Sequence, residues 1–290
     1  VYLYNGKVKR YKPDIAEQKY KDKRANSKRN YRCLECVEFL NYVVEMFNKK
    51  GWSLDASVGY AQKNNLFSTD EMVCTKTLYN YVDLGILPIK NIDLPEKLKR
   101  NTKSSSTRKN RKILGKSIEE RTETVNLREE FGHWEIDSVL GKKKDTEPAI
   151  MTIVERKTRM SLWIKIKDHS SMAIDEALQS LINRFGTKKS EVFKSITGDN
   201  GSEFANLSNI ENNGISVYFT HPYTSCEKGT NECHNKMLRR FIPKGKSIDD
   251  YSAEDILFFS DTINGLPRKI LNYHTPEELF DNQLDRIYAT

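Results

Sequence analysis

Residues 216–242 read SVYFTHPYTSCEKGTNECHNKMLRRFI. The alternating apolar residues at the start predict a short strand, and the polar stretch that includes Gly229 predicts a turn. The remainder predicts a helix that carries Glu232 near its start. Two further acids, Asp137 in HWEIDSVLG and Asp199 in ITGDNGSEF, each come at the end of a predicted strand upstream. Acids placed at strand ends and at the start of a helix predict a single metal site.

Carboxylate oxygens are the ligands that hard divalent ions such as Mg²⁺ prefer. Enzymes that hydrolyse or exchange phosphodiesters hold two such ions about 3.5–4 Å apart. We therefore expect Asp137 to bridge two Mg²⁺ ions, for which Mn²⁺ can substitute, and Asp199 and Glu232 to hold one ion each. Each acid alone also fits a plainer role, as a turn residue or a charge at a strand edge. Their order and context together favour catalysis.

Two residues near Asp137 are candidates to support the metal ligands without binding the ions. Side chains alternate along a strand, so Glu135 lies on the same strand face as Asp137. We predict that Glu135 acts as a supporting carboxylate and His133 as a supporting base. The plainer alternative for both is a hydrogen bond at the strand edge. Thr230 is predicted to cap the helix of Glu232, so that the positive helix N-terminus faces substrate phosphate or the metals.

The chain has 290 residues, of which 37% are hydrophobic and 30% are charged. This composition is that of a globular protein, with no tract long enough to cross a bilayer and no signal peptide. Five cysteines at irregular spacing do not form a disulfide framework, so we expect a reducing compartment. The first residue is Val1 and not Met, from which we expect that the upstream end is missing.

The formal net charge is +8, and it is unevenly distributed along the chain. Residues 1–120 contain 25 Lys and Arg against 14 Asp and Glu, whereas residues 121–290 contain 23 against 26. A basic first part and a near-neutral second part predict a polyanion-binding module joined to a domain with its own chemistry. The alternative is a soluble basic protein without a nucleic-acid partner.

Composition and hydrophobic periodicity divide the chain into five predicted segments. They are a basic arm (1–32), a helical DNA-binding domain (33–88), a basic flexible linker (89–125), an α/β catalytic core (126–245) and a helical extension of the core (246–290). From residue 131 on, the predicted order is strand, strand, strand, helix, strand, helix, strand, helix. Three antiparallel strands followed by helix-linked strands predict a mixed sheet with helices on both faces.

Three helices are predicted within the second segment, over residues 33–50, 53–64 and 73–82. Their spacing fits a helix-turn-helix DNA reader, although any three-helix bundle gives a similar pattern. The exposed face of the third helix would contact DNA through Thr75, Lys76, Tyr79 and Asn80.

Basic residues elsewhere are candidates for contacts with the phosphate backbone of DNA. In the linker these candidates are Lys103, Arg108, Lys109, Arg111 and Lys112, with a plain tether as the alternative. On or just after the helix of Glu232 they are Arg239, Arg240 and Lys244.

Six segments together resemble bacterial insertion-sequence transposases of the insertion sequence thirty family. They are GHWEIDSVLG, TIVERKTR, ITGDNGSEF, YFTHPYTSCEKGTNE, RRFIPKG and INGLPRKILNYHTPEELF, and CTKTLYNYV upstream resembles the second helix-turn-helix of that family. The resemblance implies an RNase H-like, retroviral-integrase-like core in which Asp137, Asp199 and Glu232 form a DDE triad.

The same resemblance implies Mg²⁺-dependent nicking of transposon ends and transfer of the 3′-hydroxyl to target DNA. It also implies binding to terminal inverted repeats as a homo-oligomer, no membrane partner, and a cytoplasmic, nucleoid-associated location in a bacterium. The chain departs from the family at Cys226, where a large aromatic or Pro side chain is frequent. A first N-terminal helix-turn-helix is not visible.

Two other functions fit the same features. A DNA-binding regulator could keep the catalytic core only as a scaffold, and a metal-dependent nuclease could hydrolyse DNA without strand transfer. Three carboxylates gathered in a scaffold would repel one another without a cation, which favours the enzyme over the regulator.

Overall fold

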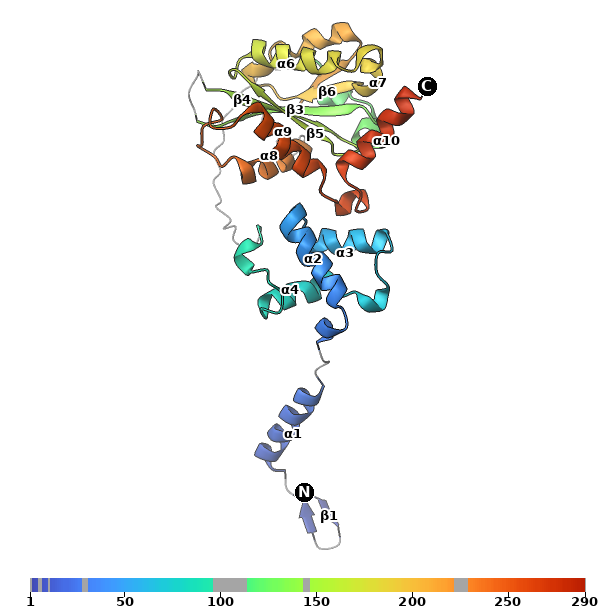
Figure 1. Cartoon of the computed structure of the whole chain (residues 1–290), viewed down its shortest axis with the longest axis vertical. Coiled ribbons are helices and arrows are strands. Elements are labelled where there is room, and N and C mark those ends of the chain that lie inside the picture. The colour runs from blue at the N-terminus through green and yellow to red at the C-terminus, as the bar shows by residue number, and fades with distance from the viewer. Residues whose placement is uncertain are drawn as a thin grey trace.

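We describe the fold from a computed structural model of the chain, for residues 2–4, 7–9, 11–27, 31–95, 114–142, 147–221 and 229–289. A basic arm, a helical domain and an α/β core follow one another along the long axis (Figure 1). No helix in these described ranges is long and apolar enough to cross a bilayer.

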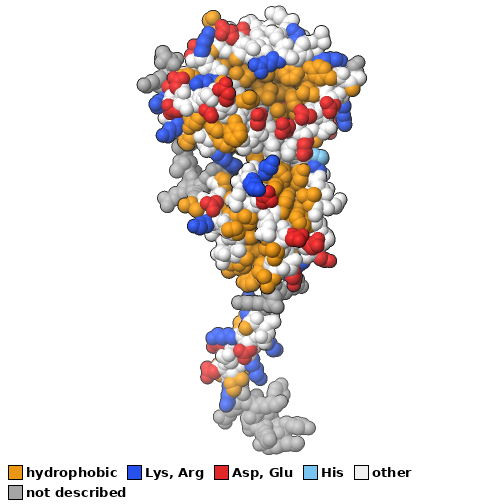
Figure 2. Space-filling model, in the orientation of Figure 1, with side chains coloured by type: hydrophobic (Ala, Val, Ile, Leu, Met, Phe, Trp, Pro, Cys, Tyr) orange, Lys and Arg blue, Asp and Glu red, His pale blue; other side chains and the backbone are white. Residues whose placement is uncertain are grey.

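The arm begins with two short strands, β1 (Tyr2–Tyr4) and β2 (Lys7–Lys9), and continues in helix α1 (Pro13–Asn26). No residue of α1 is buried, and charged side chains of both signs lie along it (Figure 2). Residues 1–32 were predicted to be a basic arm, and α1 within it is a helix with no buried side chain.

The helical domain is built from α2 (Val37–Lys50), α3 (Leu54–Lys63) and α4 (Thr75–Asp83). Gly51 ends α2 in the left-handed conformation, with φ 66°, and the Ser53 hydroxyl accepts a hydrogen bond from the backbone N–H of Ala56 to cap α3. Phe39, Leu54 and Leu78 are fully buried where the three helices meet. The three helices predicted for this segment are therefore confirmed.

The core contains a five-stranded sheet in the order β5-β4-β3-β6-β7. Its strands are β3 (His133–Leu140), β4 (Ala149–Glu155), β5 (Ser161–Ile166), β6 (Ser195–Gly198) and β7 (Ser216–Phe219). The first three pair antiparallel, whereas β6 and β7 run parallel to β3. This confirms the predicted mixed sheet.

Helices cover both faces of the sheet (Figure 1). On one face, α6 (Ser171–Asn183), α7 (Lys189–Val192) and α10 (Pro276–Tyr288) pack on Trp134, Ile136 and Met151. On the other face, α8 (Gly229–Phe241) and α9 (Ala253–Asn264) pack on Val139, Ile150 and Trp163. Because side chains alternate along β3, Glu135 and Asp137 point toward the face of α8.

Short helical turns complete the fold. They are η1 (Arg32–Leu34), η2 (Thr69–Glu71), η3 (Asn91–Asp93), η4 (Ile118–Glu120), α5 (Glu123–Leu127), η5 (Gly186–Lys188), η6 (Ser202–Phe204), η7 (Leu207–Asn213) and η9 (Lys269–Leu271).

The prediction of a flexible linker over 89–125 requires correction at both ends. Ile89 and Leu94 are buried in the core of the helical domain, and Ile118 and Val125 are also buried. The backbone N–H of Leu114 donates to the Asn200 side-chain oxygen at 3.0 Å, and Ser117 forms a β-bridge with Phe219. The few apolar residues at each end attach these segments to the two neighbouring domains.

The C-terminal segment joins the core to the helical domain. Ile256 of α9 and Phe280 of α10 are buried in the core. Between these helices, Tyr273 lies so close to α3 that a Cβ on Gly59 would be 2.0 Å from its ring. The Tyr273 hydroxyl donates to the Asp55 carboxylate at 3.4 Å. A glycine at position 59 therefore allows this interdomain contact.

Candidate active site

Asp137 and Asp199 come from neighbouring parallel strands. Glu135 of β3 pairs with Thr197 of β6, and each Asp stands two residues further along its own strand direction. Two residues is one full period of a strand, so both aspartates lie at the same level, where β6 ends. The prediction that Asp137 ends its own strand is wrong, because β3 continues to Leu140. Asp137 Oδ1 accepts from the backbone N–H of Ser138 at 3.0 Å, and Asp199 Oδ1 accepts from that of Gly201 at 2.9 Å.

Helix α8 is tied to Asp137 by one side chain. Asn235 Nδ2 donates to Asp137 Oδ2 at 2.7 Å, and Asn235 Oδ1 accepts from the Thr152 hydroxyl at 3.1 Å. Glu232 stands three residues before Asn235, close to one helical turn, and so lies on the same side of α8. The helix therefore presents Glu232 on the side that faces the aspartates.

Glu232 itself is 51% exposed, and its carboxylate pairs with Lys236 Nζ at 2.9 Å. Within the ranges that the structure describes, no three Asp, Glu, His or Cys side chains are gathered closely enough to hold a metal ion. The two aspartates and the helix of Glu232 are brought together, while the Glu232 carboxylate is directed toward Lys236.

Glu135 is completely buried beneath the start of α8. Its Oε1 forms an ion pair with Arg156, and its Oε2 accepts from the backbone N–H of Asn231 at 3.2 Å. Asn231 directly precedes Glu232, so Glu135 fixes the first turn of the helix that carries the third acid. Glu135 thus contacts α8 as a support, and its carboxylate oxygens are already used.

His133 is the first residue of β3, four residues before Asp137. Its Nδ1 is 2.7 Å from the Ser195 hydroxyl of β6, and its Nε2 is 3.0 Å from the Glu130 carboxylate. Burial lowers the pKa of His133. These contacts join β3 to β6, and they place His133 away from the aspartates that we expected it to assist.

Two residues that were not predicted from the sequence, His169 and Glu203, lie beside Ser138. His169 Nε2 lies 2.7 Å from the Ser138 hydroxyl and 3.4 Å from Glu203 Oε1. The hydrogen bond with Glu203 raises the pKa of His169, and the charges of Asp199 and Asp137 add to this effect. The signal in the sequence was an acid four residues after Asp199, in DNGSEF.

The predicted DNA-reading face of α4 is partly exposed. Lys76, Tyr79 and Asn80 point outward, while Thr75 is half-buried and donates to the Asp55 carboxylate at 3.2 Å. Lys103, Arg108, Lys109, Arg111 and Lys112 lie outside the described residues, as does Cys226.

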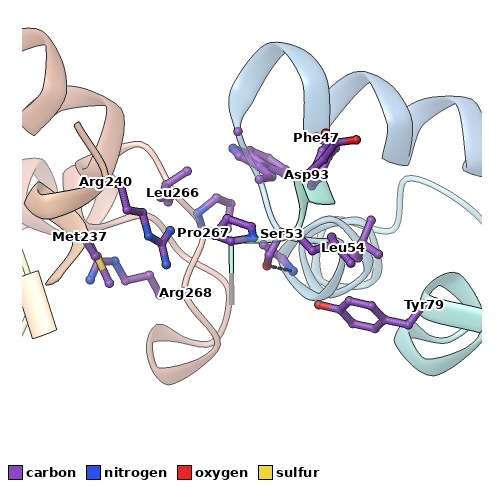
Figure 3. Close-up of a pocket in the computed structure, with 15 residues that line it drawn as sticks. Phe47, Ser53, Leu54, Tyr79, Asp93, Met237, Arg240, Leu266, Pro267 and Arg268 are labelled. Atoms are coloured by element: carbon purple, nitrogen blue, oxygen red, sulfur yellow. Dashed lines mark hydrogen bonds between the residues drawn. The ribbon is translucent and has the colours of Figure 1, made fainter. Parts of the chain in front are cut away.

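The basic residues of α8 differ in their surroundings. Arg239 is half-buried and donates to the Leu140 carbonyl at 2.8 Å, and burial lowers its pKa. Arg240 is exposed and lines a pocket of about 720 Å³ between the core and the helical domain (Figure 3). Tyr79 lines the same pocket from the other side, and Lys244 is exposed just after the helix. Two predicted DNA contacts from different domains thus share one pocket.

The mixed sheet and the paired aspartates are similar to what an integrase-type core has, and one family model matches this part of the chain. Residues 128–225 match the family model described as "Integrase core domain". This part of the chain is similar to integrase core domains, and its mixed five-stranded sheet with helices on both faces is the α/β architecture that the resemblance implied.

Individual relatives are transposases of bacterial insertion sequences. The chain is 44% identical over 207 residues to "Probable transposase for insertion-like sequence element IS1161" of Streptococcus salivarius, covering 71% of this chain and 58% of the relative. It is 32% identical over 170 residues to "Transposase InsI for insertion sequence element IS30A" of Escherichia coli (strain K12), covering 58% and 43%. It is 37% identical over 165 residues to "Transposase for insertion sequence element IS4351" of Bacteroides fragilis, covering 56% and 48%.

The chain spans about half the length of these curated relatives. It is thus related to the insertion-sequence transposases that its sequence resembled.

Proposed function

We propose that this chain is a DDE transposase that binds terminal inverted repeats, cleaves DNA strands and transfers the 3′-hydroxyl into target DNA. Asp137, Asp199 and Glu232 would carry the chemistry. The observation that supports this most strongly is the parallel register of β3 and β6, because it puts two aspartates side by side at the same level of the sheet. The bond from Asn235 to Asp137 adds the helix of Glu232 to that level.

The donor set consists of carboxylate oxygens, which suit Mg²⁺ or Mn²⁺. Asp137 would lie between two such ions, with Asp199 and Glu232 each holding one. When bound, the ions supply activation of the attacking oxygen and stabilisation of the leaving oxygen. Glu232 would have to leave Lys236, which costs little, because a half-exposed pair of this kind contributes at most about 1 kcal/mol.

The DNA substrate would span both domains. The exposed side chains of α4 would contact the transposon end, and Arg240 would hold the backbone near the core. Joining two ends requires two copies of the site, so we propose a homo-oligomer in the DNA complex. Cytoplasmic, nucleoid-associated location remains a prediction.

A strand-transfer assay tests the proposal. It uses DNA with the flanking ends of the encoding element, a target plasmid, and Mg²⁺ or Mn²⁺. We expect joined products from the wild-type chain and none from Asp137→Ala or Glu232→Ala. Full activity of either variant would refute the catalytic assignment.

The same assay separates the two alternatives. Cleavage without joined products would identify a nuclease. Binding to end DNA without cleavage, and without Mn²⁺ binding, would identify a regulator.

A further inference from the structure

A second pocket lies beside the start of α8, on a different side from Glu232. It has a volume of about 230 Å³, and Thr230, His234 and three arginines line it. The arginines are Arg128, Arg159 and Arg268, which come from three separate parts of the sequence. We call this cavity the arginine pocket.

Arg159 is the most deeply buried of the three, with only 8% of its surface exposed. Its Nη1 donates to the Thr230 hydroxyl at 2.9 Å, whereas its Nε is buried without a hydrogen-bond partner. The backbone of Arg159 is left-handed, with φ 64°, in the turn between β4 and β5. This conformation is strained for a residue other than glycine, so the surrounding structure must hold the Arg159 backbone in place.

The nearby carboxylates do not neutralise this group. Glu135 is already paired with Arg156. Buried Glu155 accepts from the backbone N–H groups of Gly132, Lys157 and Thr158. Of the residues that the structure describes, none forms an ion pair with any of the three pocket arginines. Positive charge in excess thus surrounds a small cavity.

Arg268 is held by a neutral histidine. His234 Nδ1 lies 2.8 Å from the Thr230 carbonyl, and its Nε2 lies 3.1 Å from Arg268 Nη1 and 3.2 Å from the Arg159 carbonyl. In the neutral tautomer with the proton on Nδ1, Nδ1 donates to Thr230 and Nε2 accepts from Arg268. Arg268 Nε is buried and without a partner, like that of Arg159. Burial lowers the pKa values of Arg159 and Arg268 to about 10, so both remain charged at neutral pH.

Three features of the pocket favour the same ligand. Guanidinium groups present several N–H donors in a planar fork that matches the oxygens of a phosphate. Helix α8 has 13 residues, and its N-terminus, at Gly229 and Thr230, carries partial positive charge into the same cavity. Unpaired buried charge is costly, which an anion would relieve.

We propose that the arginine pocket is a binding site for a phosphate group, separate from the metal-binding acids. The phosphate could belong to the DNA backbone or to a free phosphate ion. The DNA source rests on the proposed function, whereas the site itself does not.

Ile270 offers a test that leaves the arginines intact. It lines the pocket and is 70% exposed, so its replacement removes little buried surface. In Ile270→Glu the new carboxylate can occupy the place of the phosphate, and Ile270→Gln is the neutral control of the same shape. The melting temperature of the full chain is measured in inorganic phosphate and in chloride at equal ionic strength.

A ligand that binds only the folded state raises the melting temperature by mass action. We expect phosphate to do so for the wild type and Ile270→Gln. Ile270→Glu should melt higher than Ile270→Gln in chloride and should bind phosphate at least tenfold more weakly. Arg268→Gln should also lose the response, whereas Arg184→Gln, at an exposed position just after α6, should keep it. An equal phosphate response in Ile270→Glu and Ile270→Gln, or none in the wild type, would overturn the proposal.

The source of the phosphate is decided with a short DNA duplex and no metal. Weaker duplex binding by Ile270→Glu than by Ile270→Gln assigns the pocket to a backbone phosphate. Equal duplex binding, together with the lost response to inorganic phosphate, assigns it to free phosphate. Neither measurement depends on catalysis, so failure of strand transfer would leave this result intact.

Discussion

Two sides of helix α8 face opposite charges. On one side, Glu232 and Asn235 lie toward the two aspartates. On the other side, Thr230 and His234 line the arginine pocket. Neighbouring positions on one helix therefore face the proposed cation-binding region and the proposed anion-binding region.

Glu135 stands where the two regions meet. One carboxylate oxygen pairs with Arg156, and the other accepts from the first turn of α8. A single buried carboxylate thus stabilises positive charge on one side while it orients the helix of an acid on the other. The buried ion pair between Glu135 and Arg156 is therefore a position at which both sides can be tested together.

Glu135→Gln should have the largest effect. It leaves Arg156, whose side chain is 5% exposed, as a buried charge without its carboxylate. Breaking such a pair from one side costs about 3–5 kcal/mol. We expect the free energy of unfolding of the core, measured by chemical denaturation, to fall by about this amount.

The double variant Glu135→Gln, Arg156→Met is the matched control for that loss. Because it leaves no unpaired charge, it should regain most of the lost stability. A double variant no more stable than Glu135→Gln would show that the ion pair is not the cause.

Asn235→Ala should affect only the side of α8 that faces the aspartates. Without this amide, α8 is no longer tied to Asp137 or to the Thr152 hydroxyl. Loss of a group that orients a metal ligand typically costs about 10–100-fold in activity or metal affinity. We expect strand transfer and Mn²⁺ affinity to fall in that range, whereas Asn209→Ala, at an exposed position, should leave both unchanged. Unchanged Mn²⁺ affinity in Asn235→Ala would argue against a role in positioning.

The two sides of α8 also differ in how far the sequence predicts them. Asp137 lies within β3 and Asp199 directly follows β6, and both strands have clear hydrophobic patterns, so the parallel pairing of the two strands brings the aspartates together. Glu232 follows a turn signal at a helix start. The arginine pocket gives no comparable local signal, because Arg128, Arg159 and Arg268 are distant in sequence and a charged residue is normally solvated. Only the tertiary fold shows that they line one cavity.

The prediction of a flexible linker over residues 89–125 was wrong at both ends for a related reason. A basic, Ser-rich composition is a property of the whole segment, whereas Ile89 and Ile118 attach its ends through single apolar side chains. Asn235 could have been noticed, since it stands three residues after Glu232 on the predicted helix. Its partner Thr152, by contrast, lies on a strand more than eighty positions earlier, where no local pattern connects the two.

On each side of α8, the pKa of one histidine is shifted by the groups around it. On the arginine side, burial and then the charge of Arg268 lower the pKa of His234 to about 3. The unfolded chain, with an ordinary pKa of about 6.5, binds a proton between these values while the folded chain does not. Stability from His234 is therefore present above pH 6.5 and is lost as the pH falls toward 3.

From pH 7 to pH 5, this difference should reduce the free energy of unfolding by about 2 kcal/mol. Denaturation curves at pH 5, 6 and 7 measure it, and His234→Gln, which cannot gain a proton, should show a flatter dependence. The same slope in both proteins would mean that another group is responsible.

His169 should give the smallest effect, and one of opposite sign. The hydrogen bond with Glu203 raises its pKa in the folded chain, so the folded state holds the proton more tightly than the unfolded state. The contribution to stability is complete below the unfolded pKa and is lost as the pH rises through the folded pKa. An NMR titration of metal-free protein should place His169 above 6.5 and His234 far below it, and Glu203→Gln should lower the pKa of His169 alone. An unchanged pKa of His169 in Glu203→Gln would contradict the stabilisation of protonated His169 by Glu203.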